Sequence, residues 1–435
     1  GRCRPGQRLP THRDLAWRLG VTVGTVSRAY AEAERRGLIT GEVGRGTYVA
    51  PPATPIAHGP TAPEDQPDGF VDLSLAYPPD SEEMRLIGPA LTKLGGESIA
   101  SALMRYQPNA GRAAHRAAGA AWLERYGVFV PPERVVVTAG AQHGIVVALA
   151  ALTRPGDRVL AESLCYPGIR LVAEMLGLRL EGLAMDEHGL LPEAFEAACR
   201  NGGAKALYTI PTLHNPTTAI LPEDRRKEIA EIARSHDVAI VEDDILRLLA
   251  PDPPPTIGSF APERSYFISG LSKTTAPGLR IGYLAGPEHA VTQLVAAVRA
   301  TSWMAPPLSA EIAGRWILDG TADRILADRR ETVEAFRRRA LAVLAPLGAV
   351  APPGSLHAWL RLPEPWHAGD FAAEARRRGV GVTPAEAFAV ARRDVPPQVR
   401  ICYSAARSQD DLDRALGILA GLLAEGPSAG FAAIV

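Results

Sequence analysis

Residues Ser269–Tyr283 read SGLSKTTAPGLRIGY and directly follow the apolar run Tyr266–Ile268. In this stretch Lys273 stands among hydroxyl side chains and is followed by a Pro-Gly-Leu-Arg turn. A lysine whose pKa is lowered by its surroundings is a neutral amine, and a neutral amine forms a Schiff base with an aldehyde. Ser272 and Arg280 add a hydroxyl and a fixed guanidinium, which bind a phosphate ester. The stretch predicts an active-site loop for pyridoxal 5'-phosphate, an aldehyde that carries a phosphate; a solvated surface loop is the alternative.

The chain from Phe70 onward alternates strand-like apolar runs with alanine-rich helical stretches. This alternation is the pattern of an α/β domain with a mainly parallel central sheet. The run Val135–Val137 leads into a glycine turn and then into a helix over residues 144–152. Such a turn presents free N–H groups to an anion, although many strand-to-helix turns contain glycine. Residues 138–143 (TAGAQH) are therefore a candidate anion site.

Three further positions that can contact a flat, charged ring follow predicted strands. Tyr166 comes after the run Val159–Glu162 and can stack on a heteroaromatic ring, or lie in the core as an ordinary buried tyrosine. Asn215 lies in the stretch PTLHNPT, which follows Leu207–Ile210. Asp243 follows the next apolar run. A carboxylate there is costly unless it has a charged partner, and a protonated pyridine nitrogen is such a partner.

These motifs, in this order, resemble the cofactor site of fold-type I aminotransferases, in the branch that includes aminoadipate-type transaminases and the MocR subfamily of GntR regulators. The resemblance covers nearly the whole chain and implies a large domain with a mainly parallel sheet and a smaller C-terminal α/β domain. It implies an internal aldimine on Lys273, a ring nitrogen paired with Asp243 and a phenolic oxygen bonded by Asn215. The cofactor-binding residues implied in this way are Lys273, Asp243, Asn215, Tyr166, Gly140, Ala141, Gln142, Ser272, Arg280 and Tyr106.

Two of the implied roles concern a substrate and a second subunit. Arg400 stands alone among apolar residues in a predicted strand over residues 399–403. The resemblance implies that it grips the α-carboxylate of a substrate in bidentate fashion, while a surface-edge arginine is the alternative. The resemblance also implies a head-to-tail homodimer, in which Tyr106 reaches the phosphate bound by the neighbouring subunit.

Two features depart from that family pattern. The position three before the lysine is normally a serine that binds phosphate, whereas this chain has Gly270, with Ser269 displaced by one. The family also places a tyrosine two or three residues after the aspartate, and this chain has Ile245 and Leu246 there. Loss of that donor should change the proton balance at the cofactor, because a hydrogen bond to the phenolate stabilises the charged form. We expect that cofactor binding persists and that transamination is weakened or specialised.

Residues 1–50 carry a helix-turn-helix pattern. Thr11, with Asp14 three residues later, is a capping-box signature for a short helix, and a second helix with an inward apolar face follows Thr22. The N-terminal residues of a recognition helix enter the major groove, and here they include Thr25 and Arg28. Residues 38–49 then predict a small hairpin. A helical bundle with a hairpin and no DNA-binding role is the alternative.

The same stretch is similar to the winged helix of GntR-type regulators, through RPGQRLPTHRDLA, VTVGTVSRAYAEAERRGLI and GEVGRGTYV in that order. Many family members have an arginine where this chain has Val23, so the operator preference can differ. The chain begins at Gly1 inside this pattern and without a methionine, so we expect an N-terminal segment with the first helix to precede it. The resemblance implies contacts with double-stranded operator DNA by Arg8, Thr11, Arg13, Thr25, Arg28, Arg45 and Gly46.

Charge and cysteine usage agree with a DNA-binding protein of a reducing compartment. The net charge is −1 over 435 residues, but the first fifty residues carry nine arginines against four acidic residues. A small basic segment on a near-neutral body suits local contact with a polyanion. No run approaches the roughly 18 consecutive apolar residues that a membrane span needs, and no signal peptide is visible. The cysteines lie far apart without the spacing of a metal site, which fits a cytoplasmic protein; they are Cys3, Cys165, Cys199 and Cys402.

We predict four segments: an N-terminally incomplete winged helix-turn-helix domain at 1–50, a Pro-rich linker at 51–69, an aminotransferase-like large domain at 70–310 and a smaller C-terminal domain at 311–435. The predicted function is a cytoplasmic transcription regulator that binds operator DNA and senses an amine, an amino acid or the cofactor through Lys273. A working amino acid aminotransferase with a DNA-binding head is the second hypothesis, and a cofactor-free dimerisation module is the third. The effector or substrate, the operator, and the choice between activation and repression stay open.

Overall fold

The chain folds into two compact units, which divide between Asp68 and Gly69. No helix of the described residues is long and apolar enough to cross a membrane. The predicted linker lies, apart from Gly69, outside those residues. The computed structural model describes residues 7–35, 39–42, 46–49, 69–80, 82–391 and 395–427.

The described part of the first unit consists of α1 (His12–Leu19), α2 (Val23–Arg35), β1 (Ile39–Glu42) and β2 (Gly46–Val49). Thr11 Oγ1 accepts a hydrogen bond from the backbone N–H of Asp14 at 3.2 Å, so Thr11 caps α1 as its sequence predicts. β1 and β2 pair antiparallel, which confirms the predicted hairpin. The small core of the unit contains Ala16, Val26, Tyr30 and Ile39.

The second unit is built on a mixed sheet in which β12 is antiparallel to both its neighbours and every other pair is parallel. This confirms the predicted α/β class with a mainly parallel sheet. Because parallel strands end on one edge, the loops after β9, β10 and β11 meet there. In spatial order the strands are β4 (Val135–Thr138), β12 (Gly282–Ala285), β11 (Ser265–Gly270), β10 (Ala239–Asp243), β9 (Ala204–Thr209), β5 (Arg158–Glu162) and β6 (Arg179–Leu183).

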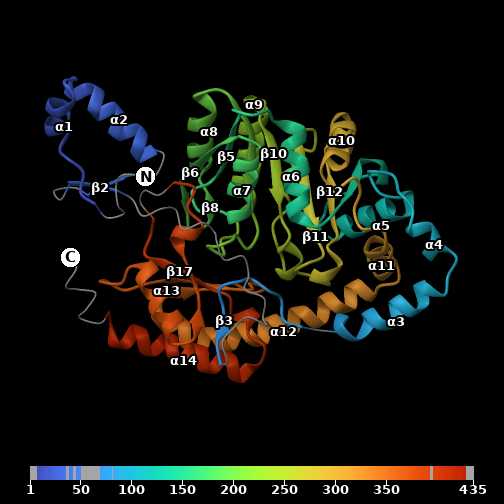
Figure 1. Cartoon of the computed structure of the whole chain (residues 1–435). Coiled ribbons are helices and arrows are strands. Elements are labelled where there is room, and N and C mark those ends of the chain that lie inside the picture. Colours follow the sequence, from blue (N-terminus) through green and yellow to red (C-terminus); the bar gives the residue numbers. More distant parts are fainter. Residues whose placement is uncertain are drawn as a thin grey trace. The chain divides into compact units, whose positions relative to one another are not determined.

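Helices cover both faces of this sheet, as Figure 1 shows. Side chains alternate along a strand, so Val136 of β4 faces one layer while Val135 and Val137 face the other. The first layer consists of α6 (Ala141–Leu152), α7 (Pro167–Met175) and α10 (Val291–Thr301). The second layer includes α5 (Ala113–Glu124), α8 (Pro192–Arg200), α9 (Glu223–Ser235) and α11 (Pro307–Leu318). This region also contains the helices α3 (Glu83–Gly95) and α4 (Ile99–Leu103) and the short strands β7 (Met185–Asp186) and β8 (Gly189–Leu190).

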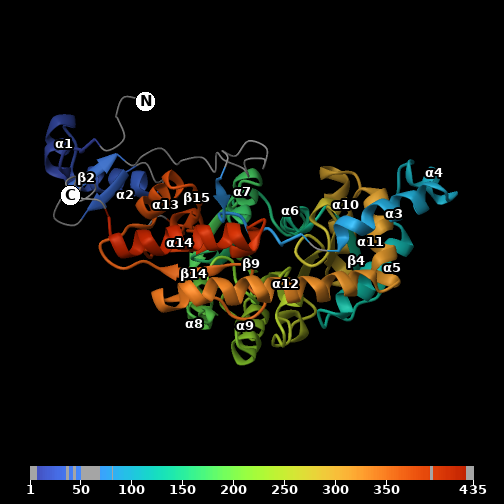
Figure 2. The same cartoon turned by 90° about the horizontal axis from the view of Figure 1, so that it is seen from below.

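A second core of this unit surrounds a four-stranded antiparallel sheet near the C-terminus. The helix α12 joins both cores, because its Val333 lies in the first and its Phe336 in the second. Figure 1 and Figure 2 both show α12 running beside α14. The boundary predicted at residue 310 lies within α11 and stays a prediction. The elements are α12 (Thr321–Leu344), β13 (Ala349–Val350), β14 (Ala358–Arg361), α13 (Ala368–Arg377), β16 (Thr383–Pro384), β17 (Gln398–Ile401), α14 (Gln409–Glu425), and the parallel pair β3 (Val71–Asp72) and β15 (Val380–Gly381).

Candidate functional site

Lys273 lies in the loop that follows β11, at the edge where the parallel strands end. Its half-buried side chain donates from Nζ to the backbone carbonyl of Ala76 at 2.5 Å. The pKa of the Lys273 amine falls from 10.5 to about 8, mainly because of burial and also because Arg400 and Arg280 lie nearby. An amine with this pKa is neutral in roughly one molecule in ten at pH 7, far more often than an ordinary lysine, and the neutral amine is the form that adds to an aldehyde.

Asp243 ends β10, the strand next to β11, and its side chain is only 3% exposed. One carboxylate oxygen, Oδ2, accepts a hydrogen bond from Tyr208 Oη at 2.7 Å. The other oxygen, Oδ1, has no hydrogen-bond partner among the described residues. Burial raises the pKa of Asp243 to about 6, against the lowering effect of the Tyr208 hydrogen bond. A buried anion with one unused oxygen fits a cationic N–H donor such as a protonated pyridine nitrogen.

An anion-binding arrangement forms where α6 begins. Gly140 precedes α6 with a φ of 84°, and a Cβ atom there would lie 2.7 Å from Nη2 of Arg280. The guanidinium of Arg280 therefore lies against the glycine turn, and its Nη1 donates to Ser272 Oγ at 3.2 Å. Ala141 and Gln142 form the first turn of the helix. Free N–H groups, a guanidinium and a hydroxyl thus meet at one place, as a phosphate ester requires.

The ring of Tyr166 lies beside this arrangement. Tyr166 directly precedes α7, and a Cβ atom on Gly168 would approach its ring carbon Cε1 to 2.2 Å. Gln142, in the first turn of α6, donates from Nε2 to the backbone carbonyl of Gly168 at 3.4 Å. Burial raises the pKa of Tyr166, and the charge of Asp243 raises it further, whereas Arg280 lowers it. The ring thus lies within electrostatic reach of both the carboxylate and the anion-binding end of the site.

Arg400 of β17 links the loop after β9 to the segment after β3. Its Nη1 donates to Asn215 Oδ1 at 2.6 Å, and its Nη2 donates to the carbonyl of Ser74 at 2.6 Å. The guanidinium lies over the ring of Phe388, 4.6 Å from the ring centroid. Arg400 is only 6% exposed, which excludes the surface-edge arginine. Its remaining N–H groups can bind a carboxylate in bidentate fashion.

Gly270, Ile245 and Leu246, which stand where the family pattern has a serine and a tyrosine, have no side-chain hydrogen-bond donor. A Cβ atom on Gly270 would lie 3.2 Å from the Cβ of Ala141. Ser269, the displaced serine, is buried, and its Oγ has no partner in the part of the chain that the structure describes. Ile245 and Leu246 pack with the first apolar core.

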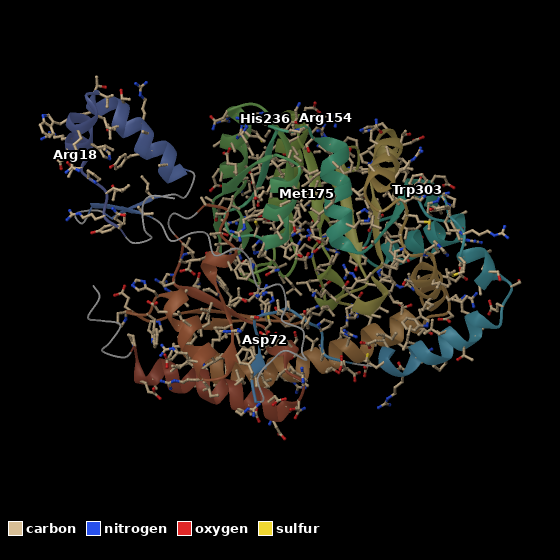
Figure 3. All side chains as sticks on the ribbon, in the orientation of Figure 1. Arg18, Asp72, Arg154, Met175, His236 and Trp303 are labelled. Atoms are coloured by element: carbon tan, nitrogen blue, oxygen red, sulfur yellow. The ribbon has the colours of Figure 1, made fainter. Side chains whose placement is uncertain are left out.

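Tyr106 lies apart from the other predicted cofactor-binding residues. Its side chain is 82% exposed, and its ring centroid is 5.9 Å from that of Trp303, which Figure 3 labels. No hydrogen bond joins it to those residues within the described ranges. Its predicted role in a second subunit's site stays a prediction.

Sequence reasoning missed two kinds of contact at this site. Tyr208 Oη, which donates to Asp243, belongs to β9, whose sequence predicts only a buried strand. The available signal is a polar group in a strand beside one that ends in a carboxylate. The carbonyls of Ser74 and Ala76 carry no signal in the sequence, because every residue has a carbonyl.

The first unit brings some of the predicted DNA-binding residues together. Arg8 forms a backbone bridge with Tyr48, and a Cβ atom on Gly46 would lie 2.9 Å from Arg8 Nε, so the arginine lies against the start of β2. Thr25 and Arg28 are exposed near the start of α2. Thr11 and Arg13 are exposed at the start of α1. Arg45 lies outside the described residues.

Comparison with known proteins gives matches for both units. The family described as "Aminotransferase class I and II" matches residues 77–419, and "Bacterial regulatory proteins, gntR family" matches residues 1–49. The uncharacterized HTH-type transcriptional regulator YdeF of Bacillus subtilis is 30% identical over 421 residues, which cover 96% of this chain and 90% of the relative. The HTH-type transcriptional regulator TauR of Rhodobacter capsulatus is 28% identical over an alignment that covers 93% of this chain and 90% of the relative. The crystal structure of an archaeal alanine:glyoxylate aminotransferase matches with a TM-score of 0.76 at 25% identity, and the match covers 82% of this chain and 91% of that chain.

Proposed function

The chain belongs to the class I and II aminotransferase family and carries a GntR-type regulatory domain. Since a relative that aligns over nearly the whole chain is named an HTH-type transcriptional regulator, we propose that this chain is a pyridoxal-phosphate-dependent, DNA-binding transcription regulator. Its second unit senses an amine or an amino acid at Lys273. Its first unit binds operator DNA, and binding to operator DNA implies work in the cytoplasm. The observation that carries the proposal is the unused buried oxygen of Asp243, which lies in one site with the low-pKa amine of Lys273.

The site residues fit the parts of the cofactor one by one. When bound, pyridoxal phosphate supplies an aldehyde and an electron-withdrawing ring. The Lys273 amine is the group that adds to the aldehyde. Asp243 pairs with the ring nitrogen, Tyr166 stacks on the ring and Asn215 binds the phenolic oxygen. The phosphate takes the N–H groups and side chains at the start of α6, together with Ser272 and Arg280; in a head-to-tail homodimer, Tyr106 of the other subunit joins them.

Arg400 selects the class of effector. A guanidinium held by Asn215 and by the Ser74 carbonyl has a fixed orientation, so that a carboxylate can meet two parallel N–H groups. The favoured effector is therefore an amino acid, with its amine toward Lys273 and its carboxylate toward Arg400. A simple amine uses only the lysine end and binds more weakly.

The first unit reads DNA through α2. Thr25 and Arg28 lie near the N-terminal end of this helix, which is the end that contacts base edges in helix-turn-helix proteins. Arg8, beside Gly46, is suited to contact the phosphate backbone. Thr11 and Arg13 add contacts at the start of α1.

An absorbance titration tests the proposal. Purified protein is titrated with pyridoxal phosphate and then with a panel of amino acids and amines, with and without 2-oxoglutarate. We expect a cofactor band that Lys273→Ala abolishes, and a lasting shift by one ligand without keto-acid product. A wild-type protein that shows no cofactor band contradicts the proposal. Accumulating keto acid supports the second candidate, an aminotransferase, which the retained Lys273, Asp243 and Asn215 favour and the loss of the tyrosine at Ile245 and Leu246 disfavours.

A further inference from the structure

Residues 73–77 (LSLAY), here called the strap, cross the candidate site between β3 and α3. They directly follow Asp72, which Figure 3 labels and which accepts a hydrogen bond from the backbone N–H of Ser74 at 2.9 Å. Most of the strap's carbonyls accept a hydrogen bond from another part of the second unit. The donors are Cys402 N to Leu73 O at 2.8 Å, Arg400 Nη2 to Ser74 O at 2.6 Å, Thr383 Oγ1 to Ser74 O at 2.7 Å, Lys273 Nζ to Ala76 O at 2.5 Å and Ser404 Oγ to Tyr77 O at 2.6 Å.

These donors fall into two classes. The Cys402 amide and the hydroxyls of Thr383 and Ser404 have no part in the proposed ligand chemistry, so their bonds to the strap are constant. Arg400 keeps its N–H groups whatever carboxylate binds, because a guanidinium has five of them. Only Lys273 changes its capacity to donate, because its nitrogen forms and breaks a covalent bond in the proposed function.

The hydrogens on Nζ can be followed through that chemistry. When the amine condenses with an aldehyde, its two hydrogens leave with the aldehyde oxygen as water, and a C=N bond forms. An unprotonated C=N nitrogen has no hydrogen, and a protonated one has a single hydrogen that the phenolic oxygen of the same cofactor would accept, so none is left for Ala76. When an effector amine takes over the same carbon, the effector's two hydrogens pass to Nζ, the bond between Nζ and that carbon breaks, and the lysine is again an amine with a hydrogen to donate.

We propose that the carbonyl of Ala76 is the acceptor for the Lys273 amine whenever that amine is not bonded to the cofactor. The strap is then anchored at Ala76 after an effector has displaced the lysine, and it is released there while the lysine is bonded. This inference rests on the proposed function and specifies how that site is regulated. Ala76 is the one hydrogen-bond partner of Nζ among the described residues, and the bond joins the strap to the loop after β11.

The strap is also close along the chain to the segment that leads to the first unit. Its first residue, Leu73, comes four residues after Gly69, where the second unit begins. Among the described residues upstream of the strap, the chain is held by the short pair β3 and β15, through Val71 N to Gly379 O at 2.8 Å and Leu73 N to Gly381 O at 2.9 Å. The Val71 side chain also lies in the C-terminal core, and the Arg376 guanidinium lies 5.1 Å from the ring centroid of Phe70. A change in how firmly the strap is held therefore acts on the chain that leads toward the DNA-binding unit.

Amide hydrogen exchange of the peptide that contains the strap tests the inference on the full chain. Three forms of the wild-type protein are compared: cofactor-free, loaded with pyridoxal phosphate, and loaded and then treated with methoxyamine. Methoxyamine takes the aldehyde carbon from any lysine and has no carboxylate for Arg400. We expect exchange in the strap to be roughly tenfold slower in the first and third forms than in the second, since they retain one more hydrogen bond.

Two variants separate the lysine bond from the constant ones. Cofactor-free Lys273→Met has no donor for Ala76, and its strap should exchange as fast as that of the loaded wild type. Ser404→Ala removes a constant bond at Tyr77, so exchange should be faster in all three forms while the difference between forms remains. Equal exchange in all three wild-type forms, with the cofactor band present, would overturn the inference and leave the proposed function standing. A missing cofactor band would overturn the proposed function itself.

Discussion

Glu242 and Asp243 are consecutive residues of β10, and both carboxylates are buried. Because side chains alternate along a strand, the two point to opposite faces of the sheet. Glu242 accepts hydrogen bonds from the backbone N–H groups of Ile257 and Gly258, both at 2.9 Å, one on each oxygen. Asp243 has the Tyr208 hydroxyl on one oxygen and no partner in the described residues on the other.

Burial and acidity alone do not separate these two residues. The pKa of Glu242 rises to about 7 and that of Asp243 to about 6, in both cases chiefly because of burial. What separates them is the completeness of their hydrogen bonding. A carboxylate whose two oxygens are both used stabilises the fold. An unused oxygen is also found on Glu162 and Asp244, so what points to a ligand at Asp243 is the unused oxygen together with its position at the end of β10, beside the loop of Lys273.

The largest expected effect is a loss of folding stability when Glu242 is replaced. Glu242→Ala leaves the N–H groups of Ile257 and Gly258 without acceptors in a buried place, so the free energy of unfolding should fall by about 4 kcal/mol, at about 2 kcal/mol for each lost partner. Chemical denaturation of the cofactor-free protein measures this. Glu242→Gln, which keeps one acceptor oxygen, should lose about half as much. An unchanged midpoint in Glu242→Ala would show that this carboxylate is not structural.

On the opposite face, Asp243→Asn should affect ligand binding and leave folding intact. The amide keeps an acceptor for Tyr208 but loses the charge that attracts a protonated ring nitrogen, so affinity for pyridoxal phosphate should fall roughly 100-fold. The stability of the cofactor-free protein should stay the same or rise, because a buried charge is removed. Equilibrium titration by absorbance measures the affinity. If Asp243→Asn lost folding stability and kept its affinity for pyridoxal phosphate, Asp243 would be a structural carboxylate and not a ligand-binding one.

Tyr208→Phe tests the role of the hydrogen bond that Tyr208 donates to Asp243 Oδ2. The Tyr208 hydrogen bond lowers the pKa of Asp243, so its loss should move that pKa above about 6. Asp243 binds a cationic ring nitrogen only when ionised, so cofactor affinity should fall as the pH drops through this pKa, at a higher pH in the variant. At pH 7 the loss should be roughly tenfold. Affinities measured from pH 5 to pH 9 test this, and coincident midpoints for variant and wild type would refute it.

In the cofactor-free protein, the folding stability that Asp243 contributes should fall as the pH rises, whereas the cofactor affinity should increase as the pH rises. The pKa of Asp243 is about 6 in the folded chain against 3.8 for the free group, so the folded state takes up the proton more readily. Its contribution to stability is therefore fully present at low pH and is lost as the pH rises through about 6. Asp243→Asn should remove this slope from denaturation curves.

The smallest expected effect concerns the ring of Tyr166. A methyl group on Gly168 would collide with that ring at 2.2 Å and with Gln142 Oε1 at 2.5 Å, so Gly168→Ala must push the ring aside. Cofactor affinity should fall roughly fivefold, in line with the loss of one stacking contact. Gly369→Ala is the matched control, since a Cβ atom there has open space, and it should leave the cofactor affinity unchanged. Equal affinities in the two variants would show that the ring does not contact the cofactor.

The sequence predicts side chains at strand ends well and contacts between distant strands poorly. Asp243 ends β10, while Gly140 and Lys273 come two and three residues after the ends of β4 and β11, so the sheet topology brings the three positions to one edge. The pairing of Tyr208 with Asp243 depends on the register between β9 and β10, which local patterns do not fix. The acceptor for Lys273 is a backbone carbonyl 197 positions away, and no residue type marks it.

Gly270 lets the loop of Lys273 lie close to the start of α6. A side chain at this position meets the Cβ of Ala141 at 3.2 Å, so a serine there requires the start of α6 to shift by a few tenths of an ångström. The backbone N of Ala141, one of the N–H groups predicted to bind the phosphate, would lie 3.5 Å from the same Cβ atom. A serine at position 270 would therefore add its hydroxyl and at the same time displace part of the anion-binding turn.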